Sequence, residues 1–164
     1  MANEKYEFVP GDEKVIAPGR TVKRIRALVA ISYFVAAGDI GGYIESEASL
    51  PVYGDAWVYG DAWVSGNARV SRDARVYGNA QVYGDARVSG NGLIFWASKV
   101  GTKNGTLTAY NTKDNSIELA RGCFTGSIDE FLSKSEKEHD DRTHLEYRLL
   151  IEVAVSRITH ARKD

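Results

Sequence analysis

Residues 52–93 read VYGDAW VYGDAW VSGNAR VSRDAR VYGNAQ VYGDAR VSGNGL, which is one six-residue unit written seven times. An eighth hexad, IFWASK, follows at Ile94. Each hexad begins with an aliphatic residue, six carry Gly at the third position, and seven carry Asp or Asn at the fourth. A period of six matches neither a helix nor the plain alternation of a long strand. Self-similarity of this kind predicts a solenoid in which each unit supplies one short strand and one corner.

The hexad also predicts which side chains are buried. Side chains alternate along a strand, so the aliphatic residue and the Ala two positions before it share one face. We expect both to point into the core. Gly-Asp and Gly-Asn pairs form the corners, because these residues accept positive φ and short turns. Arg72 replaces Gly in one hexad, so glycine is not required at every corner.

The repeat resembles that of the hexapeptide-repeat proteins, which fold as a left-handed parallel β-helix with three strands in each coil. The resemblance covers residues 44–101. IESEAS (44–49) adds one hexad upstream, and Leu50–Trp57 fits a hexad enlarged by two residues. Handedness and the three-sided coil are implied by the resemblance, since a period alone does not determine them.

Residues on either side of the repeat predict a cap and a separate module. In segment 1–43, Tyr6–Val9 and Arg20–Ile31 are expected to form a β-hairpin that covers the first coil. In segment 102–164 we expect two strands, at Thr106–Tyr110 and Ser116–Ala120, and then two helices. The helices are predicted at Ile128–Glu138 and from about His144 to Thr159, with capping boxes at Ser127/Glu130 and Thr143/Glu146 and an apolar stripe of Leu145, Leu149, Ile151, Val153, Val155 and Ile158. The predicted class is therefore mainly β, with a β-helix between an N-terminal hairpin and a C-terminal two-strand, two-helix module.

Several motifs together resemble a family of hexapeptide-repeat proteins that is common in phage and prophage genomes. They are KYEF (5–8), RIRAL (24–28), AGDIGGYIESEASL (37–50), TLTAY (106–110), RGCFTGSIDEF (121–131) and EYRLLIE (146–152), in addition to the GDA and GNA repeats. The resemblance implies a trimer and a phage or prophage setting. It brings no established activity and no catalytic residues.

Composition narrows the function classes. The chain has 164 residues, 26% of them charged and 43% hydrophobic, as in soluble globular proteins. Its 21 basic and 22 acidic residues give a net charge of −1, which does not favour bulk nucleic acid or an anionic membrane. One cysteine excludes an internal disulfide framework. Because no stretch is apolar enough to span a bilayer and MANEKYEFVP lacks the apolar core of a signal peptide, we expect a cytoplasmic protein.

Stacking the hexads three to a coil aligns aromatic residues on one outward face. Tyr59, Tyr77 and Phe95 form a predicted ladder, with Trp63 beside it. Exposed aromatic rows usually mark interfaces, so we expect this ladder to be the trimer contact. Grooves between three subunits would also suit a compact nucleotide, since aromatic rings stack on bases and Arg binds phosphate. The candidate ligand-binding residues are Tyr59, Trp63, Arg69, Arg75, Tyr77 and Arg87.

A basic cluster lies near the N-terminus, at Arg20, Lys23, Arg24 and Arg26. Alternation places Arg24 and Arg26 on one side of a strand, where they could bind an anion. The alternative, which we favour, is a solvated strand edge that basic residues protect against aggregation.

Enzyme chemistry finds little support in the sequence. Hexapeptide-repeat acyltransferases typically use a His base, and related carbonic anhydrases use three His zinc ligands. His139, His144 and His160 are the only histidines, and all lie outside the repeats. Cys123 precedes a helix, where a Cys–His nucleophile is one interpretation and a small buried hydrophobe the favoured one. We expect no catalytic residues, no metal and no cofactor.

Three functions remain open. The first is a phage-encoded protein that sequesters a small nucleotide signal of host immunity between the subunits of a trimer. The second is a protein-binding inhibitor or scaffold that uses the flat faces or the C-terminal segment, which would also allow larger assemblies through the last helix. The third is a degenerate acyltransferase.

Overall fold

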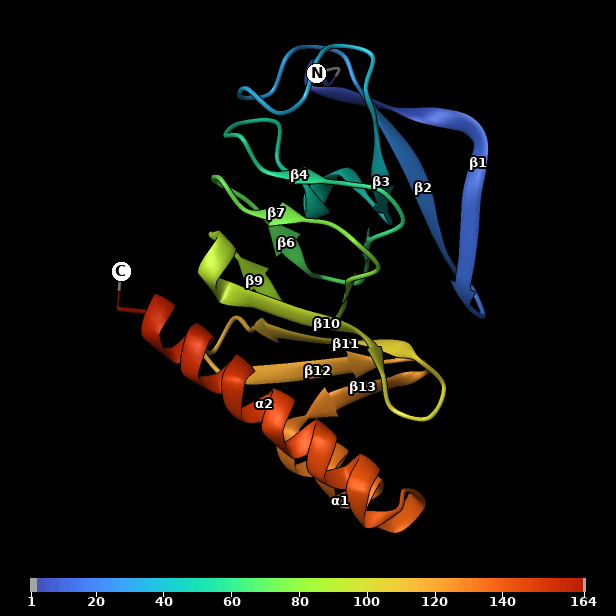
Figure 1. The fold of residues 1–164 in the computed structure, drawn as a ribbon. Coiled ribbons are helices and arrows are strands. Elements are labelled where there is room, and N and C mark those ends of the chain that lie inside the picture. Colours follow the sequence, from blue (N-terminus) through green and yellow to red (C-terminus); the bar gives the residue numbers. More distant parts are fainter. Residues whose placement is uncertain (1–2, 164) are drawn as a thin grey trace. The chain divides into compact units, whose positions relative to one another are not determined.

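The computed structural model describes residues 3–163, which fall into two compact units that divide between Asn91 and Gly92 (Figure 1). The sequence predicts three segments instead, 1–43, 44–101 and 102–164. The N-terminal hairpin is not a segment of its own, because it continues into the same sheet as the first repeats. The strands and the short helix of the N-terminal unit are β1 (Tyr6–Ala17), β2 (Arg20–Ala27), β3 (Ile40–Ile44), η1 (Glu47–Ser49), β4 (Trp57–Val58), β5 (Trp63–Val64), β6 (Arg69–Val70), β7 (Arg75–Val76), β8 (Gln81–Val82) and β9 (Arg87–Val88).

The N-terminal unit begins with a hairpin, as predicted, but its first strand extends to Ala17 instead of Val9 and its second ends at Ala27 instead of Ile31. Strands β1 and β2 pair antiparallel around the turn at Pro18 and Gly19, and the register shifts between Phe8 and Glu13. Strand β3 pairs antiparallel with β2 on one side and parallel with β5 on the other. This sheet, in the order β1-β2-β3-β5-β8, therefore changes from antiparallel to parallel pairing where the repeats begin.

The repeats form three separate parallel ladders. Trp57 pairs with Arg75 in β4–β7, and Trp63 pairs with Gln81 in β5–β8. Each pair is eighteen residues apart, which is three hexads, and the β6–β9 pair has the same offset. Tyr43 pairs with Trp63 across twenty residues, as expected from two extra residues in the hexad at Leu50–Trp57.

The core of this unit is formed by the residues that the hexads predict to point inward, because side chains alternate along each short strand. The inward Val and Ala side chains are buried from Ala56 to Val88. At the corners Gly takes positive φ in five hexads, and Arg72 takes the same conformation, with φ of 57°, in the hexad without Gly. An L residue in this region is strained by about 1 kcal/mol or more.

Two of the expected hexads depart from this pattern, although the last residue of the first one, Trp57, still pairs with Arg75. The side chain of Val52 is 54% exposed, because it lies in the enlarged hexad before the first regular strand. Ile94 begins β10, which pairs antiparallel within the C-terminal unit. The hexad IFWASK has Trp96 and Ala97 in place of the corner pair Gly-Asp, so the chain continues as an extended strand.

Two glycines allow β3 to lie against the first coil. A Cβ atom on Gly42 would be 2.6 Å from the carbonyl oxygen of Ala62, and one on Gly41 would be 2.8 Å from that of Val58. These are backbone atoms, so they cannot move aside as a flexible side chain would. The GGY sequence at 41–43 therefore fits the close approach between β3 and the first repeats.

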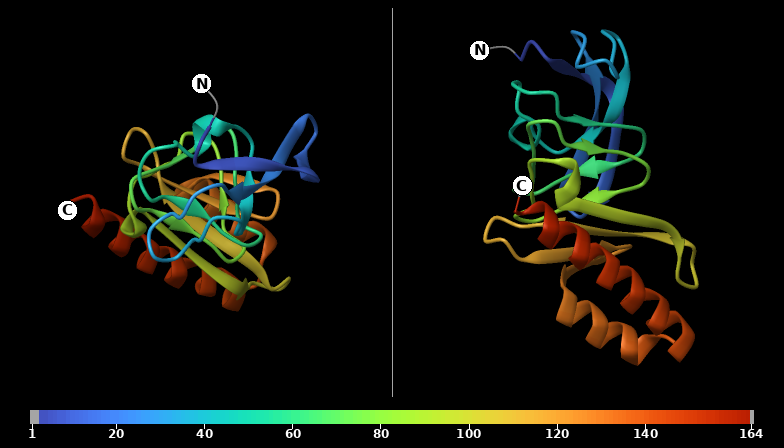
Figure 2. Two further views of the ribbon diagram at one scale, coloured as in Figure 1. Left: turned by 90° about the horizontal axis from the view of Figure 1, so that it is seen from above. Right: turned by 60° about the vertical axis from the view of Figure 1, so that its left-hand side comes forward.

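The C-terminal unit is an antiparallel sheet with two helices packed against it (Figure 2). The sheet runs in the order β10-β11-β12-β13, and its strands are consecutive along the chain. Its core is centred on Leu107, Leu119, Phe131, Tyr147 and Ile158. The elements are β10 (Ile94–Val100), β11 (Gly105–Asn111), β12 (Ile117–Arg121), β13 (Phe124–Ser127), α1 (Ile128–Glu138) and α2 (Asp141–Ala161), preceded by η2 (Asn91–Leu93).

The first helix matches its prediction and the second differs at its start. Helix α1 has the expected capping box, in which the Ser127 hydroxyl accepts from the Glu130 amide. Helix α2 begins at Asp141, with Asp140 as its N-cap accepting from the Thr143 amide, so the predicted Thr143/Glu146 box does not form. Glu146 instead accepts a hydrogen bond from the amide of Gly101.

The buried face of α2 is narrower than the apolar stripe predicted from the sequence. Tyr147, Ile151, Ala154 and Ile158 face the core, following the helical period. The other predicted stripe residues differ in exposure, and Leu145, Leu149 and Val153 are about half exposed. No helix among the described residues is both long and apolar enough to cross a membrane.

Candidate functional site

A groove on the N-terminal unit gathers two arginines beside a tyrosine. It has a volume of about 240 Å³ and is lined by Tyr53, Arg69, Ser71, Arg87, Val88 and Ser89, which we call the arginine groove. Arg69 and Arg87 point outward because each precedes a buried valine, at Val70 and Val88. Tyr53, Ser71 and Ser89 are eighteen residues apart in turn, so the offset of the ladders brings them to one corner of successive coils.

The two arginines are direct partners across the β6–β9 ladder. Like charges in this position repel. None of the lining residues is acidic, and in the part of the chain from 3 to 163 neither guanidinium pairs with a carboxylate. The groove therefore concentrates uncompensated positive charge, which favours an anion.

Arg87 is held more firmly than Arg69. Its Nη1 donates to the carbonyl oxygens of Asn67 at 2.7 Å and of Ala86 at 2.9 Å. Arg69 is exposed, and no side-chain hydrogen bond holds it within the described residues. Ser71 and Ser89 add hydroxyl donors, and Tyr53 adds an exposed ring. The groove thus offers one guanidinium held by backbone carbonyls, one exposed guanidinium, two hydroxyls and an aromatic surface.

The remaining predicted ligand residues lie in two other groups. Tyr59 and Tyr77 are in ring contact, with centroids 6.4 Å apart and planes at 89°. Burial raises the pKa of Tyr59, and the nearby charge of Arg75 opposes this. Arg75 lies 4.2 Å above the ring of Phe34.

Trp63 belongs to the second group, in contact with Tyr83 at 6.2 Å between ring centroids. The six predicted ligand residues thus do not line one pocket in a single chain. Arg69 and Arg87 line the arginine groove, and the other four do not, whereas Tyr53, Ser71 and Ser89 line it without having been predicted. The eighteen-residue spacing of these three residues is the signal that could have added them.

The predicted ladder of Tyr59, Tyr77 and Phe95 is not borne out in full. Phe95 belongs to β10 and packs against the core of the C-terminal unit. It leaves the ladder because β10 continues as an extended strand where a corner was expected. Tyr77 remains 54% exposed and Tyr59 is partly buried, so the part of the ladder that forms is the contact between these two rings.

The N-terminal basic cluster does not form an anion site, and it is not a strand edge either. Strand β2 lies between β1 and β3. Arg24 pairs with Asp12 at 3.1 Å and Arg26 pairs with Glu7 at 2.7 Å. Arg24 also donates to the Tyr43 hydroxyl and to two backbone carbonyl oxygens. These arginines join strands to one another, so their charge is already compensated within the protein.

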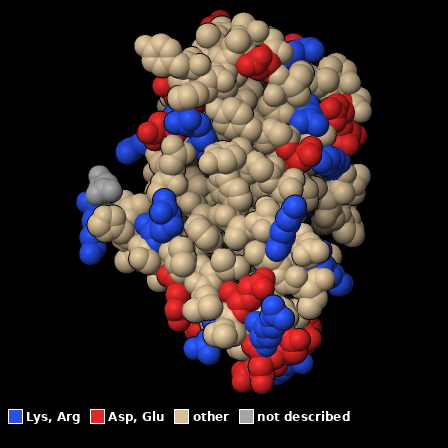
Figure 3. Space-filling model, viewed as in Figure 1, with Lys and Arg blue, Asp and Glu red and all other residues tan. Residues whose placement is uncertain are grey.

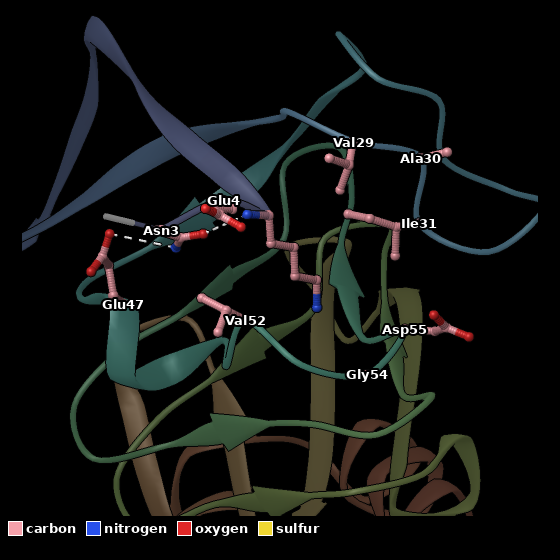
Figure 4. A pocket seen from close by; sticks show the side chains of 10 residues that line it. Asn3, Glu4, Val29, Ala30, Ile31, Glu47, Val52, Gly54 and Asp55 are labelled. Atoms are coloured by element: carbon pink, nitrogen blue, oxygen red, sulfur yellow. Dashed lines mark hydrogen bonds between the residues drawn. The ribbon is translucent and has the colours of Figure 1, made fainter. Parts of the chain in front are cut away.

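A larger hollow of about 750 Å³ lies beside the N-terminal segment (Figure 4). Its lining includes Lys5, whose side chain is almost fully buried and whose Nζ donates to the carbonyl oxygens of Pro51 and Ala56. Burial lowers the pKa of Lys5 to about 8, and Asp55 partly offsets this. Glu4, Glu47 and Asp55 make the hollow acidic, so it does not suit an anion. The Lys5 ammonium is taken up by the two backbone carbonyls.

Charge elsewhere is mixed. On the face in Figure 3, Lys and Arg are interspersed with Asp and Glu, in keeping with a net charge of −1. Within residues 3–163, no three His, Cys, Asp or Glu side chains converge as metal ligands. Cys123 is exposed, so the sequence-based interpretation of a buried hydrophobe is wrong, because the residue lies in the tight turn between β12 and β13.

Comparison with known proteins supports the repeat architecture. The family described as YdcK beta solenoid repeat matches residues 62–78 and 80–94, which cover most of the regular hexads. No curated protein matches the chain. The chain is therefore mainly β with a β-solenoid repeat, followed by two C-terminal helices.

Proposed function

We propose that this chain is a non-enzymatic binding protein that holds a small phosphate-bearing ligand, such as a nucleotide, in the arginine groove. The observation that carries the proposal is the cross-strand pair of Arg69 and Arg87 with no carboxylate beside it. A bound phosphate would replace their repulsion by charge-assisted hydrogen bonds, which Arg can form in pairs. The exposed ring of Tyr53 offers a surface for a base.

The size of the groove supports a site completed by a neighbouring chain. Pockets that bury a drug-sized ligand have volumes of about 300–1,000 Å³, so about 240 Å³ suits a phosphate or diphosphate better than a whole nucleotide. We propose that the ladders wind as a left-handed, three-sided β-helix and that three chains associate. Their contact would be the face that carries Tyr59 and Tyr77, where the exposed ring of Tyr77 lies against the partly buried ring of Tyr59.

The resemblance to phage proteins suggests the biological role. In this proposal the protein sequesters a nucleotide signal of host immunity inside the infected cell. Binding without turnover is sufficient for that role, and the groove offers guanidinium groups and hydroxyls rather than a general base.

Isothermal titration calorimetry tests the proposal. The panel contains inorganic pyrophosphate, cyclic mononucleotides, cyclic dinucleotides and cyclic ADP-ribose. We expect one of these to bind, and we expect Arg69→Gln to weaken it by about tenfold to a hundredfold, as loss of a charged hydrogen bond does. Arg157→Gln, an exposed change in the C-terminal unit, is the matched control. Absence of binding across the panel, or equal affinity in both variants, would contradict the proposal.

Light scattering tests the assembly. We expect a trimer for the natural chain and a smaller species for Tyr77→Asp, because a buried unpaired carboxylate in the contact is unfavourable. A trimer that persists in Tyr77→Asp would show that this face is not the contact.

One observation favours a second candidate, a protein-binding scaffold. Leu145, Leu149 and Val153 form a half-exposed apolar row on α2. A partner that covers this row should be recovered in a pull-down at a fixed ratio and lost with Leu149→Glu. Ligand binding in the arginine groove should not change in that variant.

A further inference from the structure

The C-terminal unit contains a hollow of its own, on the side of the sheet where β12 turns into β13. It has a volume of about 340 Å³, within the range of small-molecule sites. The β10–β11 turn, the β12–β13 turn and both helices contribute to its lining. This hollow is independent of the arginine groove, since all its residues belong to the C-terminal unit.

Arg121 is built into the wall of this hollow. Its Nε donates to the Tyr147 hydroxyl at 3.0 Å. Two glycines of the β10–β11 turn leave room for this pair. A Cβ atom on Gly105 would lie 2.7 Å from Cζ of Arg121, and one on Gly101 would touch the Tyr147 hydroxyl. Among residues 3–163, the Nη groups of Arg121 donate no hydrogen bond, so an oriented guanidinium fork remains available.

The charge of the lining favours an anion. Lys103, Arg121 and Lys134 contribute three positive charges, against the single carboxylate of Glu138. A guanidinium fork matches the two oxygens of a carboxylate or phosphate. The fixed fork and the surrounding lysines therefore point to a small acid.

The floor of the hollow is aromatic. Phe124 and Phe131 have ring centroids 5.3 Å apart, and Phe131 and Tyr147 have centroids 5.0 Å apart. These edge-to-face contacts leave apolar ring surface beside the cations. A ligand with a flat apolar body would bury against this surface while its acid group meets Arg121.

The junction of the two helices holds the far wall in place. Ser135 is buried, and its hydroxyl hydrogen-bonds to Nδ1 of both His139 and His144, at 3.1 and 3.0 Å. The His139 ring also lies against Tyr147, with centroids 5.5 Å apart. Because these contacts tie α1 to α2, the aromatic floor is fixed before any ligand arrives, which reduces the entropic cost of binding.

We infer that this hollow binds a small aromatic anion, with its carboxylate or phosphate on Arg121 and its ring against Phe124 and Phe131. Cys123 lies on the rim of the hollow, is exposed, and is the only cysteine of the chain. It therefore serves as a built-in reporter, because a bound ligand covers its thiol.

The test measures the rate at which N-ethylmaleimide, a small neutral reagent, alkylates Cys123 in the full-length protein. The probes are 2-naphthoate and 2-naphthyl phosphate, which distinguish a carboxylate from a phosphate, and 2-naphthalenemethanol as the neutral control. We expect at least one anion to slow alkylation at millimolar concentrations. The neutral alcohol should need about tenfold more for the same protection, because it lacks the charged pair with Arg121.

Two variants test the role of Arg121. Arg121→Gln should raise the half-protecting concentration of the anion by about tenfold. Gly105→Ala keeps the charge but displaces the flexible end of Arg121, so it should weaken protection without preventing folding. Arg157→Gln, which is exposed and outside the hollow, should have no effect.

Three results would overturn the inference. They are alkylation that neither anion slows, equal protection by the anions and the alcohol, and unchanged protection in both Arg121→Gln and Gly105→Ala. None of these measurements depends on the arginine groove, so failure here leaves the proposed function standing. In the Arg69→Gln variant, the anions should protect Cys123 from alkylation as well as they do in the natural chain.

Discussion

Replacing Arg69 by glutamine should make the protein more stable while it weakens ligand binding. Arg69 and Arg87 are direct partners on adjacent strands with no carboxylate nearby. Two unit charges one strand spacing apart, about 4.8 Å, repel by about 0.9 kcal/mol in bulk water. At a separation of about 8 Å, which long side chains can reach, the figure is about 0.5 kcal/mol. Glutamine suits the position, since Gln81 already occupies the same outward place on the β5–β8 ladder.

Urea unfolding followed by tryptophan fluorescence measures this change. At about 0.01 M salt, where the screening length is about 30 Å, we expect Arg69→Gln to raise the free energy of unfolding by about 0.5 kcal/mol. At about 1 M salt, where that length is about 3 Å, the gain should vanish. Arg26→Gln is the control of opposite sign. It breaks the pair with Glu7 and should destabilise the chain by up to about 1 kcal/mol at low salt. A loss of stability in Arg69→Gln, or a gain that persists at high salt, would refute the conclusion that Arg69 and Arg87 repel each other in the folded protein.

Three further changes test the fold. Gly42→Ala should lower the free energy of unfolding by about 1–3 kcal/mol, because its Cβ would meet the Ala62 carbonyl. Gly90→Ala, whose nearest neighbour is 3.9 Å away, should cost nothing, and equal losses would contradict the close packing of β3. Burial lowers the pKa of Lys5 to about 8 from its ordinary 10.5, so the unfolded chain holds the proton more tightly. Stability should therefore rise from pH 8 toward pH 10, by at most about 1.4 kcal/mol per pH unit, and Lys5→Met should lack this rise in pH-dependent urea unfolding. Ser127→Ala should cost about 1 kcal/mol in the same assay, and no loss would show that the capping box contributes little.

The success of the hexad analysis has a physical cause. Within a strand, the direction of each side chain follows from its place in the sequence, so the inward Val and Ala positions could be named without the structure. The three-hexad offset then determines which outward residues meet, as Arg69 and Arg87 do. The capping box of α1 was equally accessible, because its two partners are three residues apart.

The failures concern residues whose environment depends on distant parts of the chain. Arg24 belongs to a basic cluster whose composition suggests an anion site. Asp12 and Tyr43, from two other strands, nevertheless accept the hydrogen bonds of its guanidinium group. Phe95 fits the aromatic ladder by count, but it joins another core once β10 pairs with β11. The general tendency of free cysteines predicts a buried Cys123, whereas a two-residue turn leaves it exposed.

Short-range geometry governs the part of the fold that can be predicted from the residues alone. The hexad repeat specifies strand, corner, inward face and coil spacing, because alternation and turn preference act over a few residues. Which charges are compensated and where hollows remain depends instead on the packing of distant segments. Arg121 acquires its fixed position from Tyr147 and Gly105, which lie 26 and 16 residues away along the chain. Contacts between such distant residues depend on how whole helices and strands pack, and no local pattern in the sequence encodes them.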